Sequence, residues 1–131
     1  MTNVAELKFP ASIPVPEISL SLHRDQVSGL NLYILVKDFH LGPPELAVKG
    51  RRPTGQGNLY INGKKVRRLY GAYQHLSEGL FKPGVNLVMV SLCDHDQRPC
   101  KRNGVHIQAS CFLNLDTEEL VLHSFSSSPT H

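Results

Sequence analysis

The chain lacks the features that mark several protein classes. Its 131 residues include no tryptophan, and aromatic residues make up only 7%. No apolar run approaches the roughly 18 residues that a membrane-spanning helix needs, so we expect a soluble protein without membrane contact. Three cysteines are too few for a disulfide scaffold. Residues 1–9 lack the basic start and apolar stretch of a secretory signal. These absences predict a cytoplasmic protein, or alternatively an exported one whose leader has been removed.

Catalytic motifs are also missing. The sequence contains no Gly-x-Ser-x-Gly turn, no Gly-x-Gly-x-x-Gly fingerprint and no phosphate-binding loop. Cys93 and Cys100 lie in no known nucleophile context, and a loop alone does not activate a thiol. We therefore expect no enzymatic activity.

Nine prolines and ten glycines, by contrast, indicate many turns. Between them, apolar residues recur at every second position, the period of a half-buried strand. Asn62-Gly63 is the favoured pair for a type I′ hairpin turn. A short strand at 46–48, a helical turn at 72–76 and a polar loop at 93–104 are also expected. The main expected strands cover residues 17–23, 30–39, 59–61, 66–70, 85–92, 105–115 and 120–125.

This pattern predicts one all-β domain, an immunoglobulin-like antiparallel β-sandwich of about seven strands over residues 17–125. A small β-barrel is the alternative architecture. Residues 1–16 are expected to form an extended lead-in, because three prolines interrupt them. Residues 126–131 are expected to form a disordered tail.

Basic residues concentrate in one part of a chain whose net charge is only +3. Seven of them lie between Lys49 and Arg68, with no acidic residue among them. One face could therefore attract anions, or these charges could protect a strand edge from aggregation. The candidate surface for an anion or partner is formed by Lys64, Lys65, Arg67, Arg68, Tyr60 and Tyr70. Nucleic-acid binding is a weaker alternative, because the domain is far less basic than that class requires.

The segment 57–71, Gly-Asn-Leu-Tyr-Ile-Asn-Gly-Lys-Lys-Val-Arg-Arg-Leu-Tyr-Gly, resembles an uncharacterised bacterial family of small, often exported β-sandwich proteins. Members carry a Gly-His-Ala-His-Leu-Tyr hairpin, then Lys-x-x-Arg-Leu-Tyr-Gly, a Leu-x-Pro-Gly turn and Asn-Asp-His. The later motifs correspond here to 80–84 and 92–95, and the resemblance covers residues 29–107. The family's hairpin histidines are replaced by Gln56 and Asn58, which weakens the metal role that a His-x-His pair would imply.

The densest cluster of candidate ligands is Cys93-Asp94-His95-Asp96, followed by Cys100. Together with His75, the two thiols and His95 could hold zinc or copper, although Cys-x6-Cys is not a standard zinc spacing. Alternatively, Cys93 and Cys100 form a disulfide, or they are free thiols in a loop whose aspartates cap a turn. Cys111 falls in phase with core residues.

The function predicted from these features is a non-catalytic binding or interaction module for an unidentified protein or small ligand. Its working surface is expected to combine the hairpin at 58–70 with the loop at 93–102. A zinc- or copper-handling protein is the first alternative, and a weak nucleic-acid binder is the second.

Overall fold

The computed structural model describes residues 7–8, 15–46, 54–102 and 104–126. These residues form strands and two short 3-10 helices, and none of them belongs to an α-helix. No helix within these ranges is long and apolar enough to cross a membrane. The all-β prediction is therefore confirmed. The elements are β1 (Leu7–Lys8), β2 (Glu17–Arg24), β3 (Leu30–Lys37), β4 (His40–Leu41), η1 (Pro44–Leu46), β5 (Thr54–Ile61), β6 (Lys64–Leu69), β7 (Tyr73–Leu76), η2 (Glu78–Leu80), β8 (Val85–Cys93), β9 (Cys100–Arg102), β10 (Val105–His106), β11 (Gln108–Asn114) and β12 (Val121–Ser126).

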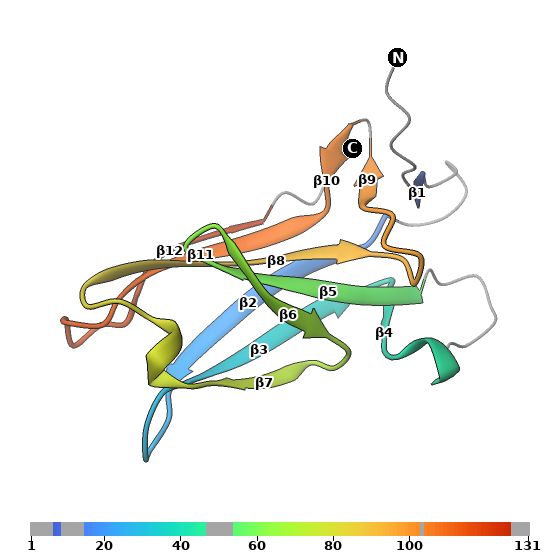
Figure 1. The fold of residues 1–131 in the computed structure, drawn as a ribbon. Coiled ribbons are helices and arrows are strands. Elements are labelled where there is room, and N and C mark those ends of the chain that lie inside the picture. Colours follow the sequence, from blue (N-terminus) through green and yellow to red (C-terminus); the bar gives the residue numbers. More distant parts are fainter. Residues whose placement is uncertain (1–6, 9–14, 47–53, 103, 127–131) are drawn as a thin grey trace.

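Two sheets lie face to face (Figure 1). The large sheet has the order β12-β11-β8-β5-β4, and β6 also pairs with β5. The small sheet has the order β2-β3-β7, and a third sheet of short strands, β1-β9-β10, adjoins one end of the large sheet. Along one side, β2 approaches β12, where the Ser126 hydroxyl donates to the Ile18 carbonyl at 2.7 Å. The large sheet thus curls around the small one, between a sandwich and a half-barrel.

The core lies between the two sheets because alternate residues of each strand face inward. On β3, Leu30, Leu32 and Ile34 are buried as the alternation predicts. On the large sheet, Leu59 of β5 lies beside Val90 of β8, and both are buried. Cys111 is also buried, which confirms its predicted place in the core.

The Asn62-Gly63 turn forms as predicted, with φ angles of 53° and 82°. The buried side chain of Asn86, on β8, anchors this turn because it accepts a hydrogen bond from the Asn62 side chain at 2.9 Å. Asn86 in turn donates to the carbonyls of Lys82 and Gly84. The hairpin is therefore fixed to the turn that precedes β8.

Two local predictions were wrong. Residues 72–76 do not form a helical turn, because residues 73–76 are strand β7. Leu76 is buried opposite Leu30, and this pairing with β3 determines the local structure. Leu46 ends a 3-10 helix instead of beginning a strand, while residues 47 and 48 lie outside the described residues.

Four further details also differ from the prediction. The expected loop at 93–104 contains β9. Val105, expected on the core face, is 46% exposed. Ser126 closes β12 and does not belong to a tail. Leu7 and Lys8, in the expected lead-in, pair with β9 as strand β1. Most of the lead-in and residues 127–131 lie outside the described residues.

The two faces of β3 provide a test of the packing. Leu32 is fully buried, whereas Leu35 on the same strand is 60% exposed. We expect Leu32→Ala to lower the free energy of unfolding by about 3 kcal/mol, because it removes buried apolar surface and leaves a cavity. Leu35→Ala should change it by less than about 1 kcal/mol. Urea unfolding of both variants measures the difference, and equal losses would contradict this packing.

Candidate functional site

A pocket of about 440 Å³ lies on the outer face of the large sheet, where the hairpin meets the segment after β8. The hairpin strands β5 and β6 contribute Asn58, Tyr60, Lys65 and Arg68. The end of β8 and the segment after it contribute Cys93, Gln97 and Pro99. The structure therefore brings together the two regions in which the sequence analysis placed a working surface.

Strand register places the hairpin side chains on this face. Asn58 lies opposite Ser91 of β8 and Arg68 of β6, whereas its neighbour Leu59 faces the core. Directly opposed residues in antiparallel strands project from the same face of a sheet. Asn58 therefore points outward and forms part of the pocket floor.

A β-bulge places two cations on one face. Lys65 and Arg68 are three positions apart on β6, so simple alternation would put them on opposite faces. The register shifts between Leu59 and Tyr60, which leaves one extra residue on β6 and pairs Lys65 with Tyr60. Lys65 and Arg68 consequently both line the pocket.

The other basic residues of the candidate surface lie elsewhere. Lys64 and Arg67 pair with Ile61 and Leu59, whose side chains face the core, and both basic residues are exposed. Tyr70, just after β6, is 38% exposed. None of these three lines the pocket. Of the six predicted residues, the structure therefore gathers Tyr60, Lys65 and Arg68 and leaves the others outside.

The polar floor of the pocket is incompletely hydrogen-bonded. Asn58 is only 9% exposed, and its Nδ2 donates to the Cys93 sulfur at 3.3 Å. Its Oδ1 is buried and has no hydrogen-bond partner among the described residues, and the same holds for Nε2 of Gln56. A buried polar atom without a partner costs about 1–3 kcal/mol. In the sequence, Gln56 and Asn58 stand out only because they occupy the positions of the two histidines in the bacterial family's hairpin motif. That position in the motif is the one signal that points to them.

The cysteines near the pocket are free thiols, and Cys111 is free as well. Burial raises the pKa of Cys93, while the side chains of Asn58 and Gln56 oppose the rise. Burial also raises the pKa of Cys100 to about 12. Both sulfurs are therefore protonated at neutral pH, and a protonated thiol is a poor nucleophile.

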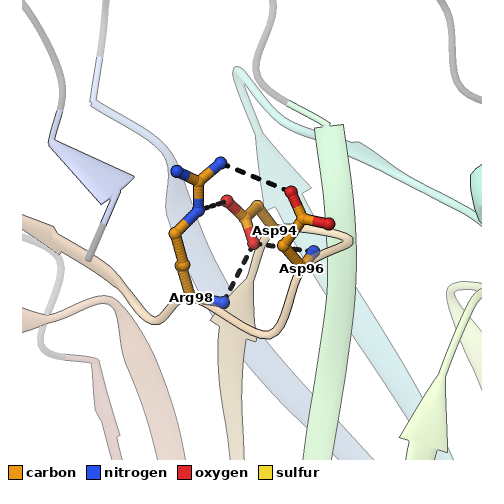
Figure 2. Close-up of polar contacts among 3 residues, drawn as sticks. All are labelled: Asp94, Asp96 and Arg98. Atoms are coloured by element: carbon orange, nitrogen blue, oxygen red, sulfur yellow. Dashed lines mark hydrogen bonds and ion pairs between the residues drawn. The ribbon is translucent and has the colours of Figure 1, made fainter. Parts of the chain in front are cut away.

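The loop after β8 is held by one carboxylate (Figure 2). Asp94 Oδ1 accepts the backbone N–H groups of Asp96 and Arg98, both at 2.9 Å. Asp94 Oδ2 accepts from Arg98 Nε at 2.6 Å, and Asp96 lies 3.6 Å from the same guanidinium. Asp94 thus caps the turn as one sequence interpretation expected, and it fixes the segment that carries Gln97 and Pro99.

The four predicted metal ligands do not come together. His75 is on β7, opposite Asn31, and its Nδ1 lies 2.9 Å from the Asn31 Oδ1. That pair projects from the outer face of the small sheet, whereas Cys93 belongs to the large sheet. Both ring nitrogens of His95 are buried without a partner. Among the residues that the structure describes, no three His, Cys, Asp or Glu side chains are placed to hold a metal ion.

Two aspartates on the same loop provide a matched test of its construction. The Asp94 side chain is 10% exposed and that of Asp96 is 82% exposed, although both face Arg98. We expect Asp94→Ala to lower the free energy of unfolding by about 2 kcal/mol, because it removes several charge-assisted hydrogen bonds. Asp96→Ala should cost less than about 0.5 kcal/mol, as is usual for an exposed ion pair. Chemical denaturation distinguishes the two, and a comparable cost for both would refute the assigned role of Asp94.

The raised pKa of Cys100 predicts a loss of stability at alkaline pH. In the unfolded chain the thiol ionises near pH 9.0, whereas in the folded protein it stays protonated up to about pH 12. The unfolded state therefore binds fewer protons in this window. Stability is fully present below pH 9 and falls as the pH rises, by up to about 1.4 kcal/mol per pH unit from this group.

The variant Cys100→Ala isolates this contribution. The difference in the free energy of unfolding between this variant and the wild type should be constant below pH 9. It should shrink from pH 9 to 11. Denaturation curves across this range measure the difference. Parallel pH profiles would show that Cys100 does not titrate as its burial requires.

Comparisons with known proteins return no family model, no curated protein and no solved structure that matches the chain. The resemblance to the bacterial β-sandwich family and the immunoglobulin-like class accordingly stay predictions.

Proposed function

We propose that this domain is a non-catalytic binding module whose ligand occupies the pocket between the hairpin and the loop after β8. The observation that carries the proposal is the Asn58 amide, which is buried at the pocket floor with its Oδ1 unpartnered. Native proteins rarely leave such an atom unsatisfied. A ligand that hydrogen-bonds to Asn58 would remove this cost once the side chain turns its Oδ1, which is closed to solvent in the free protein, toward the pocket.

The dimensions of the pocket favour a small molecule. Its volume of about 440 Å³ falls within the range of roughly 300–1,000 Å³ that is typical of small-molecule sites. The half-buried Tyr60 ring and Pro99 provide apolar contact area, while the polar groups provide specificity. The sequence left open whether the partner is a protein or a small ligand, and this combination supports a small ligand.

The chemistry around the pocket supports binding without catalysis. The Cys93 thiol is protonated at neutral pH because burial raises its pKa. Nucleophilic catalysis by cysteine requires a thiolate and a neighbouring base. His106 lines the pocket as well, but a thiol that stays protonated is not an activated nucleophile. The pocket thus contains polar recognition groups without an activated nucleophile.

The proposal includes the immunoglobulin-like class and a cytoplasmic location. The two facing sheets, antiparallel except where the short β4 pairs with β5, support the first. Three free thiols support the second, because thiols persist in a reducing compartment.

The proposal is tested by titrating isotope-labelled protein with a chemically diverse library of charged and neutral small molecules. We expect bound compounds to shift the NMR resonances of Asn58, Gln97 and Cys93. A second pocket of about 340 Å³, lined in part by Arg24, Val27 and Lys82, serves as an internal comparison. The proposal is ruled out if compounds shift only resonances of the second pocket, or if no compound binds.

The variant Asn58→Leu separates binding from folding. It replaces a half-satisfied amide by an apolar side chain of similar volume, so we expect the free energy of unfolding to be unchanged or higher by about 1 kcal/mol. Binding of the library compounds should be lost. A variant that binds as well as wild type would show that Asn58 is not the recognition group.

A further inference from the structure

We infer that the ligand of this pocket is a small hydroxylated anion, meaning a sugar or polyol that carries a phosphate or carboxylate group. This inference rests on the proposed function and specifies the chemistry of that site. It is based on two features on different sides of the pocket, namely the pair of cations on β6 and the unsatisfied amide on β5.

The charge of the pocket selects an anion. Lys65 and Arg68 both line it, as does His106, and among the residues that the structure describes no acidic side chain does. The nearest carboxylates along the chain, Asp94 and Asp96, face the Arg98 guanidinium, which offsets their field. An arginine guanidinium matches the oxygens of a phosphate or carboxylate in a bidentate manner, and a lysine adds a second positive charge. The cations therefore provide the anchoring point for the charged end of the ligand.

The floor of the pocket selects a hydroxyl group. Phosphate and carboxylate oxygens only accept hydrogen bonds when they are ionised, so they cannot satisfy the Asn58 Oδ1. Oδ1 is closed to solvent in the free protein, so a ligand hydroxyl donates to it only after the Asn58 side chain turns toward the pocket. The thiol of Cys93 beside Asn58 is uncharged at neutral pH, so it does not repel an anionic ligand. The amide and the cations thus require two different groups on one molecule.

Four probes separate these requirements: ribose 5-phosphate, ribose, inorganic phosphate and gluconate. We expect ribose 5-phosphate or gluconate to bind at least about ten-fold more tightly than ribose or inorganic phosphate, because only the first two satisfy both ends of the pocket. Tighter binding of ribose 5-phosphate assigns the charged group as phosphate, and tighter binding of gluconate assigns it as carboxylate. Isothermal titration calorimetry measures all four. If ribose binds as well as the charged probes, the inference is overturned.

The hairpin offers a matched pair of charge variants. Lys65→Gln/Arg68→Gln removes two charges from the pocket side of β6, whereas Lys64→Gln/Arg67→Gln removes two charges from the other face of the same strand. We expect the first variant to weaken binding of the preferred probe by at least about ten-fold and the second by less than about two-fold, because the second pair makes no direct contact. Equal weakening by both would indicate general electrostatic attraction and would overturn the inferred site.

The outcomes distinguish failure of this inference from failure of the proposed function. If neutral library compounds shift the resonances of Asn58 and Gln97 while the four probes do not bind, the pocket is a binding site for a different chemical class. The proposed function then stands and the hydroxylated anion is excluded. If the anionic probes bind but shift resonances away from this pocket, both proposals fail.

Discussion

The pairing of β5 with β8 on one side and with β6 on the other is the constraint on which the core, the hairpin and the pocket depend. Six of the eight residues of β5 are buried, so the strand is covered on both faces. Gly55 and Gly57 allow this close packing. A Cβ atom at Gly55 would lie 2.0 Å from the Cys93 carbonyl oxygen, and one at Gly57 would lie 3.0 Å from a Val90 methyl group. A larger residue at Gly55 would push β5 away from the backbone of β8, whereas one at Gly57 would require the Val90 side chain to shift.

The outward side chains of the same strand have a different role. Gln56 and Asn58 are amides in positions where an ordinary sheet would expose them to water, yet both are buried. The end of β8 and the loop held by Asp94 enclose this part of the sheet, and Cys93 is among the residues that contact Asn58. Burial of amides with unsatisfied atoms lowers stability and is rarely retained without a function. The domain therefore has an apolar core between its sheets and two buried, incompletely hydrogen-bonded amides on the outer face of the large sheet. These amides distinguish the pocket from an ordinary hollow in the surface.

The parts of the structure that depend on local pattern could be predicted from the sequence. The alternation of Leu30, Leu32 and Ile34 fixes which face of β3 is buried, and Asn62-Gly63 determines the hairpin turn because both residues adopt positive φ. The parts that depend on distant partners could not. Strand β7 has only four residues, too few to show a period, and it is extended because β3 pairs with it. The same pairing separates His75 from Cys93, which the sequence had suggested as two ligands of one metal ion.

The basic hairpin shows why the pocket itself was beyond sequence reasoning. By alternation, Lys65 and Arg68 belong to opposite faces, and only the bulge that leaves one extra residue on β6 brings them together. The sequence suggested two interpretations of this charge, protection of a strand edge and attraction of an anion. The structure places the charges of this segment on two different faces. β6 pairs only with β5 and is therefore an edge strand, where the exposed Lys64 and Arg67 disfavour pairing with another chain. Lys65 and Arg68 face the pocket, where an edge charge would have no protective role. The one extra residue thus gives this basic segment two faces, one exposed at the strand edge and one that lines the pocket.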